Sequence, residues 1–411
     1  MSEPKIVIGA GAAGLTAAAV CAERGSRVLL IEKMERPGRK LRITGKGRCN
    51  VTNATFDLQG LLEHIPTNPR FLYSAFSNFM PYDTIALMED LGVPTKIERG
   101  ERVFPVSDNA TDIVDALVRR AKNAGVQFLQ GTVERLELTE DGRRVQAVHL
   151  TDGRRLTCHS VAVCTGGCSY PATGSTGDGY KLAQQAGHTL IEPVPSLVSL
   201  VSHDADCKKM MGLALKNVTL TLFEDSKAIF DEQGEMLFTH FGISGPLTLS
   251  ASSHLGDMKK HKYHAEIDLK PALSEEQLYD RITRDFALLA NHAAQGALVK
   301  LLPSSMQPVM VARWGIDPAT KANQITREQK RELVQLMKHW RVSIDARGDL
   351  AHAVITSGGV SVREVDPKTM QSKKALGLYF AGEVLDVDAY TGGYNLQIAF
   401  CTAQSFARNL D

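Results

Sequence analysis

Short apolar runs alternate with helix-length stretches at the start of the chain. Residues 5–9 and 27–32 are nearly continuous apolar runs, which is the pattern of strands buried on both faces of a parallel sheet. The stretch between them, residues 12–24, is rich in small residues and has the length of a helix. A strand, a helix and a second strand within about 30 residues predict one complete βαβ unit.

The same reasoning predicts further elements before residue 193. Apolar positions at helical spacing indicate one helix, and a buried strand leads into a second Gly-rich stretch. An Asp-Gly turn separates two more strands. In chain order, we expect a Gly- and Arg-rich loop at 36–56, a helix at 110–124, strands near 126–139 and 144–151, a strand at 160–165 and a Gly-rich loop at 166–179.

The pattern changes around Pro193 and Pro195. Beyond them, apolar and polar residues alternate as in half-buried strands, and amphipathic helices follow. We therefore predict an α/β, Rossmann-type domain formed by residues 1–193 and 351–411, interrupted by an insertion at 194–350. The later elements are β-like alternation at 196–270, helices at 275–290 and 326–340, strands within 340–363, and a strand, Gly-rich turn and helix within 376–408.

Composition narrows the class of protein. With 411 residues, 43% of them hydrophobic and 23% charged, the chain is that of a globular protein of two or three domains. A formal net charge of +1 argues against bulk attraction to nucleic acid or anionic membranes. We find no apolar run long enough for a membrane span and no signal peptide at Met1–Lys5, so we expect a cytoplasmic protein. Seven scattered cysteines predict reduced thiols and no metal site.

Gly9-Ala10-Gly11-Ala12-Ala13-Gly14 lies between the first strand and the first helix. In such a fingerprint Gly9 permits a tight turn, Gly11 lets the backbone approach a pyrophosphate, and Gly14 allows close helix–strand packing. Glu32 ends the second strand, where a carboxylate accepts hydrogen bonds from ribose hydroxyls. The spacing and its context predict a dinucleotide, so the question becomes FAD or NAD.

Three features favour FAD, bound without a covalent link. Basic and amide side chains follow the second strand directly, and Thr165-Gly166-Gly167 follows a buried strand. A final strand ends at Gly382-Glu383, and Gly392-Gly393-Tyr394-Asn395 begins a helix whose N–H groups would stabilise negative charge on reduced flavin. The side chains after the second strand are Arg39, Lys40, Thr44, Arg48, Asn50 and Asn53, around Gly45.

Long segments of the chain, running nearly end to end, resemble the bacterial NAD(P)/FAD-dependent oxidoreductases of the aminoacetone-oxidase-like family, to which a bile-acid 3-dehydro-4,6-reductase is related. The segments are Gly38-Arg-Lys-Leu, Gly47–Asn53, Arg102–Val106, Tyr170–Tyr180, Ile243–Pro246, Gly358-Gly-Val, Glu364–Met370 and Ala381–Asp388. The family often has glycine where this chain has Lys46 and Ala389.

The resemblance implies an FAD domain with an inserted β-barrel and helical domain, which serves as a substrate or cap domain. It also implies which residues contact FAD. Together with the fingerprint, the predicted cofactor-binding set is Gly9, Gly11, Ala12, Ala13, Gly14, Glu32, Lys33, Arg39, Lys40, Thr44, Gly45, Arg48, Asn50, Val133, Thr165, Gly166, Gly382, Glu383, Asp386, Gly393, Tyr394, Asn395, Leu396 and Ile398.

Gly174-Ser-Thr-Gly-Asp-Gly179 is similar to a stretch of fumarate-reductase-type flavoproteins, which favours hydride transfer to an activated carbon–carbon double bond. A proton donor is then needed, and the candidates are Tyr170, Arg48, His240 and Tyr390. Each also has a structural interpretation: Arg48 as a flavin or phosphate contact, His240 as a packed or surface histidine, and the tyrosines as pocket walls. Cys168 has no visible histidine partner for a nucleophilic role.

Electron supply and substrate stay open at this point. The chain has no second Gly-x-Gly-x-x-Gly, so NAD(P)H would dock transiently over the flavin; otherwise electrons come from another protein or pass to oxygen. The leading hypothesis is an FAD-dependent reductase or oxidase of a small apolar substrate such as an enone. The alternatives are an RNA-modifying flavoenzyme, permitted by Arg39-Lys40, Lys208-Lys209 and Lys259-Lys260-His261-Lys262, and a redox-sensing flavoprotein. The basic runs also have a structural interpretation as solvated surface. The oligomeric state is open.

Overall fold

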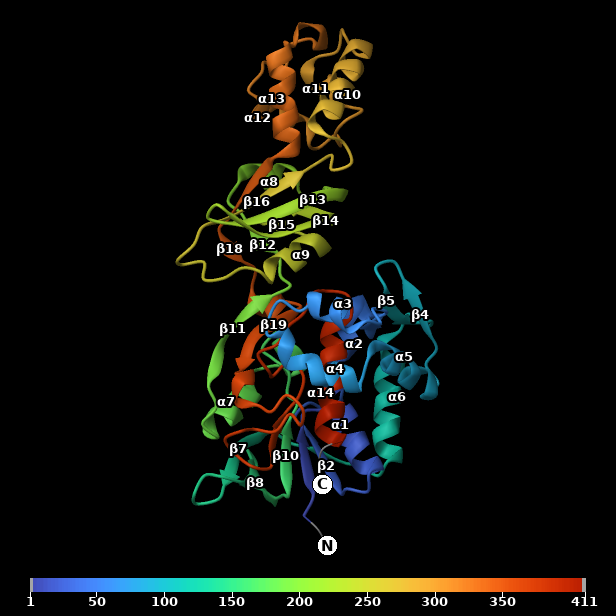
Figure 1. Ribbon diagram of the computed structural model, residues 1–411, viewed down its shortest axis with the longest axis vertical. Coiled ribbons are helices and arrows are strands. Elements are labelled where there is room, and N and C mark those ends of the chain that lie inside the picture. Colours follow the sequence, from blue (N-terminus) through green and yellow to red (C-terminus); the bar gives the residue numbers. More distant parts are fainter. Residues whose placement is uncertain (1–2, 409–411) are drawn as a thin grey trace. The chain divides into compact units, whose positions relative to one another are not determined.

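The computed structural model describes residues 3–408 and divides into two units, Met1–Ser196 with Leu350–Asp411, and Leu197–Asp349 (Figure 1). Met1 and Ser2, part of the segment judged not to be a signal peptide, lie outside the described residues. The predicted boundaries at 193/194 and 350/351 fall three residues and one residue away from these divisions. Pro193 and Pro195 lie inside the strand β11 (Leu190–Ser196), which pairs with β19 (Ile355–Val360) with a register shift between Ile191 and Val194.

The first unit is built on a five-stranded parallel sheet of order β20-β10-β1-β2-β6. Every residue of β1 and β10 is buried, as their continuous apolar sequences predict. β20 pairs with β10 although more than 200 residues separate them, so the two ends of the chain meet in this sheet. The strands are β1 (Lys5–Ile8), β2 (Val28–Glu32), β6 (Gln127–Gln130), β10 (Ser160–Val163) and β20 (Leu378–Phe380).

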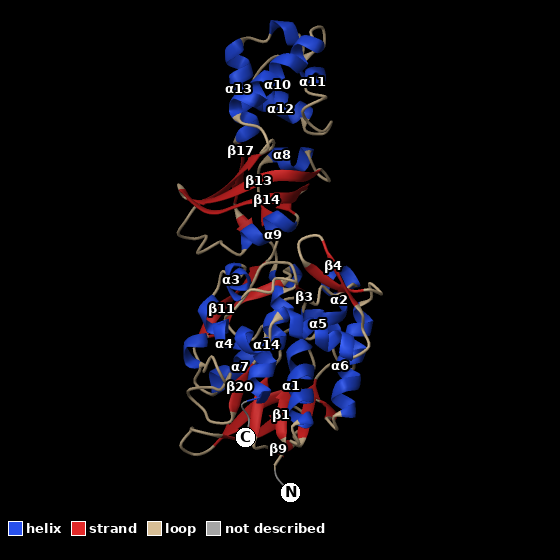
Figure 2. Cartoon of the chain, turned by 45° about the vertical axis from the view of Figure 1, so that its right-hand side comes forward, coloured by secondary structure: helices blue, strands red, loops and turns tan. Residues whose placement is uncertain are grey.

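Three long helices pack together beside this sheet. The helix α1 (Ala12–Glu23) contacts both α6 (Ala110–Asn123) and α14 (Tyr394–Arg408), as Figure 1 shows. Its alanines 17, 18 and 19 are fully buried, because small side chains let neighbouring helices approach on every side. Figure 2 shows these helices against the strands. A separate antiparallel sheet, β7 (Val133–Leu138), β8 (Val145–Leu150) and β9 (Arg155–Thr157), contacts β10 through β8. The helix α7 (Asp178–Gln185) precedes β11.

The segment 36–56 is more ordered than the loop that its glycines predict. It forms the short helix α2 (Arg39–Ile43), a 3-10 turn (Thr44–Gly47) and β3 (Thr52–Asn53). Its Gly and Arg content gave no periodic pattern, and the helix is too short to show one. No elements were predicted for the residues after it, which form α3 (Leu58–Glu63), α4 (Tyr73–Asn78), α5 (Pro81–Asp90), β4 (Thr95–Glu98) and β5 (Arg102–Pro105).

The second unit contains a seven-stranded antiparallel sheet of order β17-β16-β13-β14-β15-β12-β18. Its two edge strands, β17 (Trp340–Ile344) and β18 (Ala346–Arg347), are separated in sequence by Asp345 alone. The sheet must therefore curl until its edges meet, which produces a barrel. The backbone N–H of Asp345 donates to the carbonyl of Val201 at 2.9 Å, across the point where the edges meet. The inner strands are β12 (Leu200–Val201), β13 (Ala214–Glu224), β14 (Lys227–Thr239), β15 (Gly242–Ser244) and β16 (Tyr263–Asp268).

Helices complete the second unit. The two predicted helices are present as α10 (Glu275–Leu288) and α13 (Arg327–Lys338), and each begins with a capping box, at Ser274 and Thr326. Two short helices that the sequence did not reveal, α11 (Ala294–Ala297) and α12 (Gln307–Trp314), group with them in Figure 2. The remaining helices are α8 (Ala205–Lys209) and α9 (Pro246–Ser252).

The described residues contain neither a membrane-spanning helix nor a cluster of metal ligands. None of the helices between residues 3 and 408 has the length and apolar character of a membrane span. Within the same range, no group of three or more His, Cys, Asp or Glu side chains is arranged to hold a metal ion. All seven cysteines are free thiols, and all but Cys168 are buried.

Candidate functional site

The three fingerprint glycines differ in the space around them. A Cβ added to Gly14 would lie 1.8 Å from the carbonyl oxygen of Gly9, and one added to Gly9 would lie 2.6 Å from that of Cys164. At Gly11, by contrast, an added Cβ would meet nothing within 4 Å, and the backbone is extended with φ of −85°. Gly9 and Gly14 are thus required by packing, whereas Gly11 keeps an open space at the start of α1. That space faces N–H groups at the positive end of the helix dipole, which suits a pyrophosphate.

Predicted residues from both ends of the chain meet around this space. A Cβ on Gly382, which follows β20, would lie 3.1 Å from the Cβ of Ala13 at the start of α1. Glu32, at the end of β2, accepts the N–H groups of Ala10 at 2.7 Å and Met34 at 2.8 Å, which holds its carboxylate beside the fingerprint. The N–H of Gly131, near Val133, donates to the carbonyl of Glu32 at 3.0 Å. The Glu32 carboxylate therefore lies beside the fingerprint, where the ribose is predicted to bind.

A second group of predicted residues is joined by Glu383. Its carboxylate accepts hydrogen bonds from Lys40 Nζ at 2.7 and 2.9 Å and from the N–H of Thr356 at 2.9 Å. Ser169 Oγ adds a longer contact of 3.4 Å, and its Cys168 neighbour donates its N–H to Thr356 Oγ1. These bonds tie the Gly-rich loop after β10 to α2 and to the loop after β20. Lys33 is anchored in the same way, by Asp178 and Thr176.

The N-terminus of α14 is fixed by tight backbone contacts. A Cβ on Gly393 would lie 2.3 Å from the carbonyl of Thr52 in β3, so only glycine fits. The side chain of Asn395 spans a turn, since it accepts from the N–H of Ala389 at 3.0 Å and donates to its carbonyl at 2.8 Å. Asn53 Nδ2 donates to the carbonyl of Gly392 at 3.1 Å. The helix end is thus held rigidly, as a group of backbone donors must be to stabilise charge.

His64 belongs to this region, although its sequence context gave no signal. Its ring stacks on Tyr394 with centroids 4.5 Å apart and meets Tyr390 edge-on at 5.9 Å. Its carbonyl accepts the N–H of Tyr390 at 2.9 Å. Tyr390, one of the predicted proton donors, is therefore part of an aromatic cluster at the start of α14.

Other predicted residues are placed differently. Arg48 is held by Glu98 and Asp108, and its guanidinium lies 4.1 Å from the Phe104 ring centroid, so its charge is already compensated. His240 is an exposed residue at the turn before β15, in the second unit. Tyr170 is half-buried in a left-handed conformation. Burial raises the pKa of the Cys168 thiol, which disfavours a thiolate nucleophile there.

The remaining predicted cofactor residues lie along the same elements. Asn50 Oδ1 and Thr165 Oγ1 are buried atoms without a hydrogen-bond partner among the described residues. Such orphaned polar atoms fit a site whose ligand supplies the missing partners. Asp386 accepts from Asn68 Nδ2 at 2.9 Å, and burial raises the pKa of its carboxyl. Arg39 is exposed, Thr44 donates to the carbonyl of Leu41, Gly45 lies in the 3-10 turn, and Leu396 and Ile398 lie in α14.

Asp388 is a buried carboxyl that holds the two strands leading to the second unit. Ser357 Oγ in β19 donates to it at 2.9 Å, and Ser196 Oγ in β11 at 3.2 Å. Burial raises its pKa, the Thr67, Ser357 and Ser196 hydroxyls lower it, and the charge of Glu383 raises it.

This raised pKa gives a testable pH dependence. The folded state binds the Asp388 proton more tightly than the unfolded state, so its contribution to stability is largest below the ordinary Asp pKa of about 4 and declines as pH rises toward 7. Asp388→Asn removes this titration. Urea unfolding of both proteins should show the variant gaining on the wild type as pH increases. A stability difference that is constant over this range would contradict the assignment.

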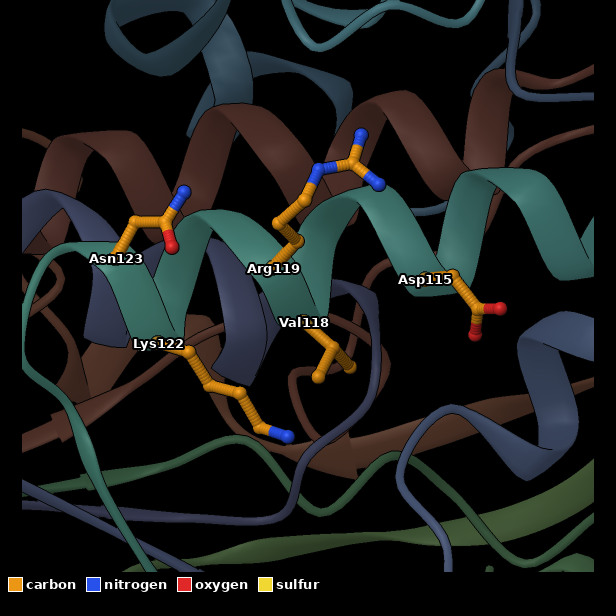
Figure 3. A pocket seen from close by; sticks show the side chains of 5 residues that line it. All are labelled: Asp115, Val118, Arg119, Lys122 and Asn123. Carbon is orange, nitrogen blue, oxygen red and sulfur yellow. The ribbon is translucent and has the colours of Figure 1, made fainter.

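A shallow surface depression lies on α6. It is lined by Asp115, Val118, Arg119, Lys122 and Asn123 (Figure 3). All five belong to a single helix, and Asp115 is paired with Arg42. None is a predicted site residue, so the depression is not part of the cofactor site.

Together, the parallel sheet, the open space at Gly11, the Glu32 carboxylate and the anchored start of α14 define a Rossmann flavoprotein, an FAD-dependent oxidoreductase by class. The family described as "HI0933-like protein Rossmann domain" matches residues 3–409. The chain belongs to this HI0933-like family.

Curated relatives match over nearly the whole chain. The chain is 31% identical over 408 residues to the ribosomal RNA dihydrouridine synthase of Escherichia coli (strain K12), covering 98% of this chain and 97% of that protein. It is 30% identical to the 3-dehydro-bile acid delta(4,6)-reductase of Clostridium scindens, covering 96% of each.

Solved structures agree on the fold. The 3-ketosteroid delta1-dehydrogenase of Sterolibacterium denitrificans matches with a TM-score of 0.52 and 12% identity, over all of both chains. The 3-ketosteroid-delta4-(5alpha)-dehydrogenase of Rhodococcus jostii RHA1 matches with a TM-score of 0.51 and 14% identity, over 99% of this chain and 98% of that one. At these identities the likeness supports the flavoprotein fold alone.

Proposed function

We propose that this protein reduces a carbon–carbon double bond conjugated to a carbonyl group, with NAD(P)H as electron donor. The observation that carries the proposal is the shared chemistry in the names of the two kinds of relative. A delta(4,6)-reductase of a 3-dehydro bile acid and a dihydrouridine synthase both act on such a bond. Each relative aligns with almost the entire chain, so the same site would perform the same reaction class here.

Residues of the first unit would hold FAD and stabilise the charge on its reduced form. FAD, when bound, supplies hydride transfer from its N5 atom. The open space at Gly11 and the N–H groups of α1 would hold the pyrophosphate, and Glu32 would orient a ribose. The rigid N-terminus of α14 would stabilise negative charge at the flavin pyrimidine edge.

Proton delivery is assigned to Tyr390. It is the predicted donor whose segment adjoins the start of α14, where Asn395 Nδ2 donates to its carbonyl at 3.2 Å. The rings of His64 and Tyr394 restrict this segment. Tyr390→Phe should lower the rate of substrate reduction by about a hundredfold, the usual size of a general-acid effect, and leave flavin reduction by the donor unchanged. Equal loss in both half-reactions would refute a role in proton transfer.

The experiment is anaerobic stopped-flow spectroscopy of the yellow holoprotein. NADH or NADPH should bleach the flavin band, and a 3-keto-4-ene steroid or cyclohexenone should restore it faster than buffer alone. If neither nucleotide bleaches the flavin, the donor is wrong. If reduced flavin reoxidises only with oxygen, the proposed acceptor is wrong and an oxidase is indicated.

A second candidate is the same reaction on a uracil base within RNA. It is favoured by two relatives named ribosomal RNA dihydrouridine synthase, from Escherichia coli and Haemophilus influenzae, each 31% identical over 98% of this chain. The C5=C6 bond of uracil is conjugated to its C4 carbonyl, so the flavin chemistry is unchanged. The near-zero net charge argues only against bulk attraction of the whole chain to nucleic acid, so it does not exclude an RNA substrate. RNA digests, analysed by mass spectrometry for a gain of two hydrogens per uridine, would test it.

A further inference from the structure

The segment from Arg36 to Phe56 carries six basic residues and no acidic residue. Half of these cations are already compensated: Lys40 pairs with Glu383, Arg42 with Asp115, and Arg48 with Glu98 and Asp108. The others, Arg36, Arg39 and Lys46, are exposed and have no acidic partner among the described residues. They are three uncompensated positive charges within one segment, which the net charge of +1 conceals.

Lys46 occupies a position where glycine would be easier to accommodate. Its φ is 59°, between Gly45 at 57° and Gly47 at 83°, so three successive residues are left-handed. A side chain in this region carries a conformational cost that glycine avoids. In return for this cost, Lys46 adds an exposed cation to the loop.

Two exposed aromatic rings accompany the cations. Phe56, just after β3, is 51% exposed, and Tyr82, in the first turn of α5, is 52% exposed. Their ring centroids are 6.4 Å apart. Large aromatic side chains left half in water are unfavourable unless a partner covers them, and nucleic acid bases are natural partners for such rings.

The turn between β4 and β5 joins these features into one surface. Ala54, two residues before Phe56, donates its N–H to the carbonyl of Glu101 at 2.6 Å. On the other side, the guanidinium of Arg102 lies 5.7 Å from the Phe104 ring centroid, and a Cβ on Gly45 would lie 3.3 Å from the same ring.

This turn adds two exposed cations, Arg99 and Arg102, which also lack an acidic partner in the part of the chain that the structure describes. Glu101 shares the turn, and its charge reduces but does not cancel theirs. Asn53 donates to the carbonyls of both Gly100 and Gly392, so the turn borders the start of α14 and with it the cofactor site.

We propose that Lys46, Arg99, Arg102, Phe56 and Tyr82 form an RNA-docking surface for a single-stranded segment next to the flavin. The cations would neutralise backbone phosphates, and the two rings would stack on bases that flank the uridine to be reduced. The inference rests on the second candidate function, the reduction of uracil in RNA.

The basic runs in the second unit are weaker candidates. Lys209 pairs with Asp206 and Lys260 with Asp257, and neither run includes an exposed aromatic pair. They supply matched controls, because they carry the same charge in a different setting.

The test is fluorescence anisotropy of oxidised holoprotein with a labelled, uridine-containing single-stranded RNA over a series of salt concentrations. Lys46→Gln with Arg99→Gln should weaken binding at least tenfold and reduce the slope of log affinity against log salt by about 1.4, the value for two lost phosphate contacts. Phe56→Ala with Tyr82→Ala should weaken binding by about tenfold or more with an unchanged slope. Lys259→Gln with Lys260→Gln should bind as the wild type does.

Flavin absorbance per protein verifies that each variant is folded and loaded. The surface is refuted if the wild type does not bind RNA, if the two double variants at this surface bind normally, or if they change only the concentration of NADPH needed to bleach the flavin. The anisotropy assay contains no electron donor, so it measures RNA binding without turnover of the enzyme. RNA binding without uridine reduction would refute the second candidate function and keep the surface. Uridine reduction with normal RNA binding by the surface variants would refute the surface alone, and a wild type that reduces enones but does not bind RNA would refute both.

Discussion

Gly11→Val is expected to yield a folded but colourless protein. No atom lies within 4 Å of a Cβ at this position, and the backbone is in an extended conformation that valine adopts readily. The fold therefore tolerates the side chain, which instead fills the space predicted for the pyrophosphate. An overlap that costs about 3 kcal/mol weakens FAD binding by roughly a hundredfold. The measurement is flavin content after purification, followed by titration with FAD.

Two comparisons make this result specific. The melting temperature of Gly11→Val should equal that of wild-type protein stripped of FAD, because bound ligand is the only stabilisation lost. Gly14→Ala should behave differently and lose both fold and flavin, since its Cβ would lie 1.8 Å from a backbone oxygen. A yellow Gly11→Val protein with wild-type affinity would show that the cofactor does not use the fingerprint.

Gln397→Ala is expected to destabilise the first unit by about 3 to 5 kcal/mol, because it creates a cavity and strands buried polar groups. Gln397 is fully buried in α14. Its Oε1 accepts from Thr52 Oγ1 at 2.7 Å and Thr84 Oγ1 at 2.6 Å, and its Nε2 donates to the carbonyl of Phe79 at 3.0 Å. The side chain thus fastens α14 to β3, to α5 and to Phe79 in the short connection between α4 and α5.

Urea unfolding monitored by circular dichroism and flavin release measures this effect. Gln397→Met restores most of the volume without the hydrogen bonds, so its loss of stability reports the polar part alone. Gln59→Ala is the control, since Gln59 is exposed and should change stability by no more than about 0.5 kcal/mol. A loss below about 1 kcal/mol for Gln397→Ala would mean that these hydrogen bonds do not hold the helix.

The sequence was most informative where structure is local. The unit β1–α1–β2 could be predicted nearly to the residue, because buried strands, a helix of small residues and a glycine turn each carry their own signal. The segment from α3 to β5 could not, since its helices are short and their burial comes from contacts with distant elements such as α14. The β-structure of the insertion was predicted from alternation and its barrel form from the family resemblance, whereas the seven strands and the role of Asp345 at the closure were visible only in the structure.

In the candidate site, too, some roles can be predicted from the sequence and others depend on contacts that only the fold creates. The role of Gly11 follows from spacing, but the residue type of Arg48 does not reveal whether its charge is available. Its partners Glu98 and Asp108 lie 50 and 60 residues further along the chain, and folding alone brings them to it. His64 illustrates the opposite case, because a single histidine in a loop has no pattern, and only the fold stacks it on Tyr394.

The order of the central sheet has a consequence for how the protein is made. Its edge strand β20 and the helix α14 come from the last part of the chain, while β1 and α1 come from the first. On the ribosome, Leu197–Asp349 emerges complete before Leu350–Asp411, so the barrel can fold while the nucleotide-binding half still lacks an edge. We therefore expect flavin capture late in biosynthesis, and nascent chains arrested before β20 should contain a folded barrel but no flavin.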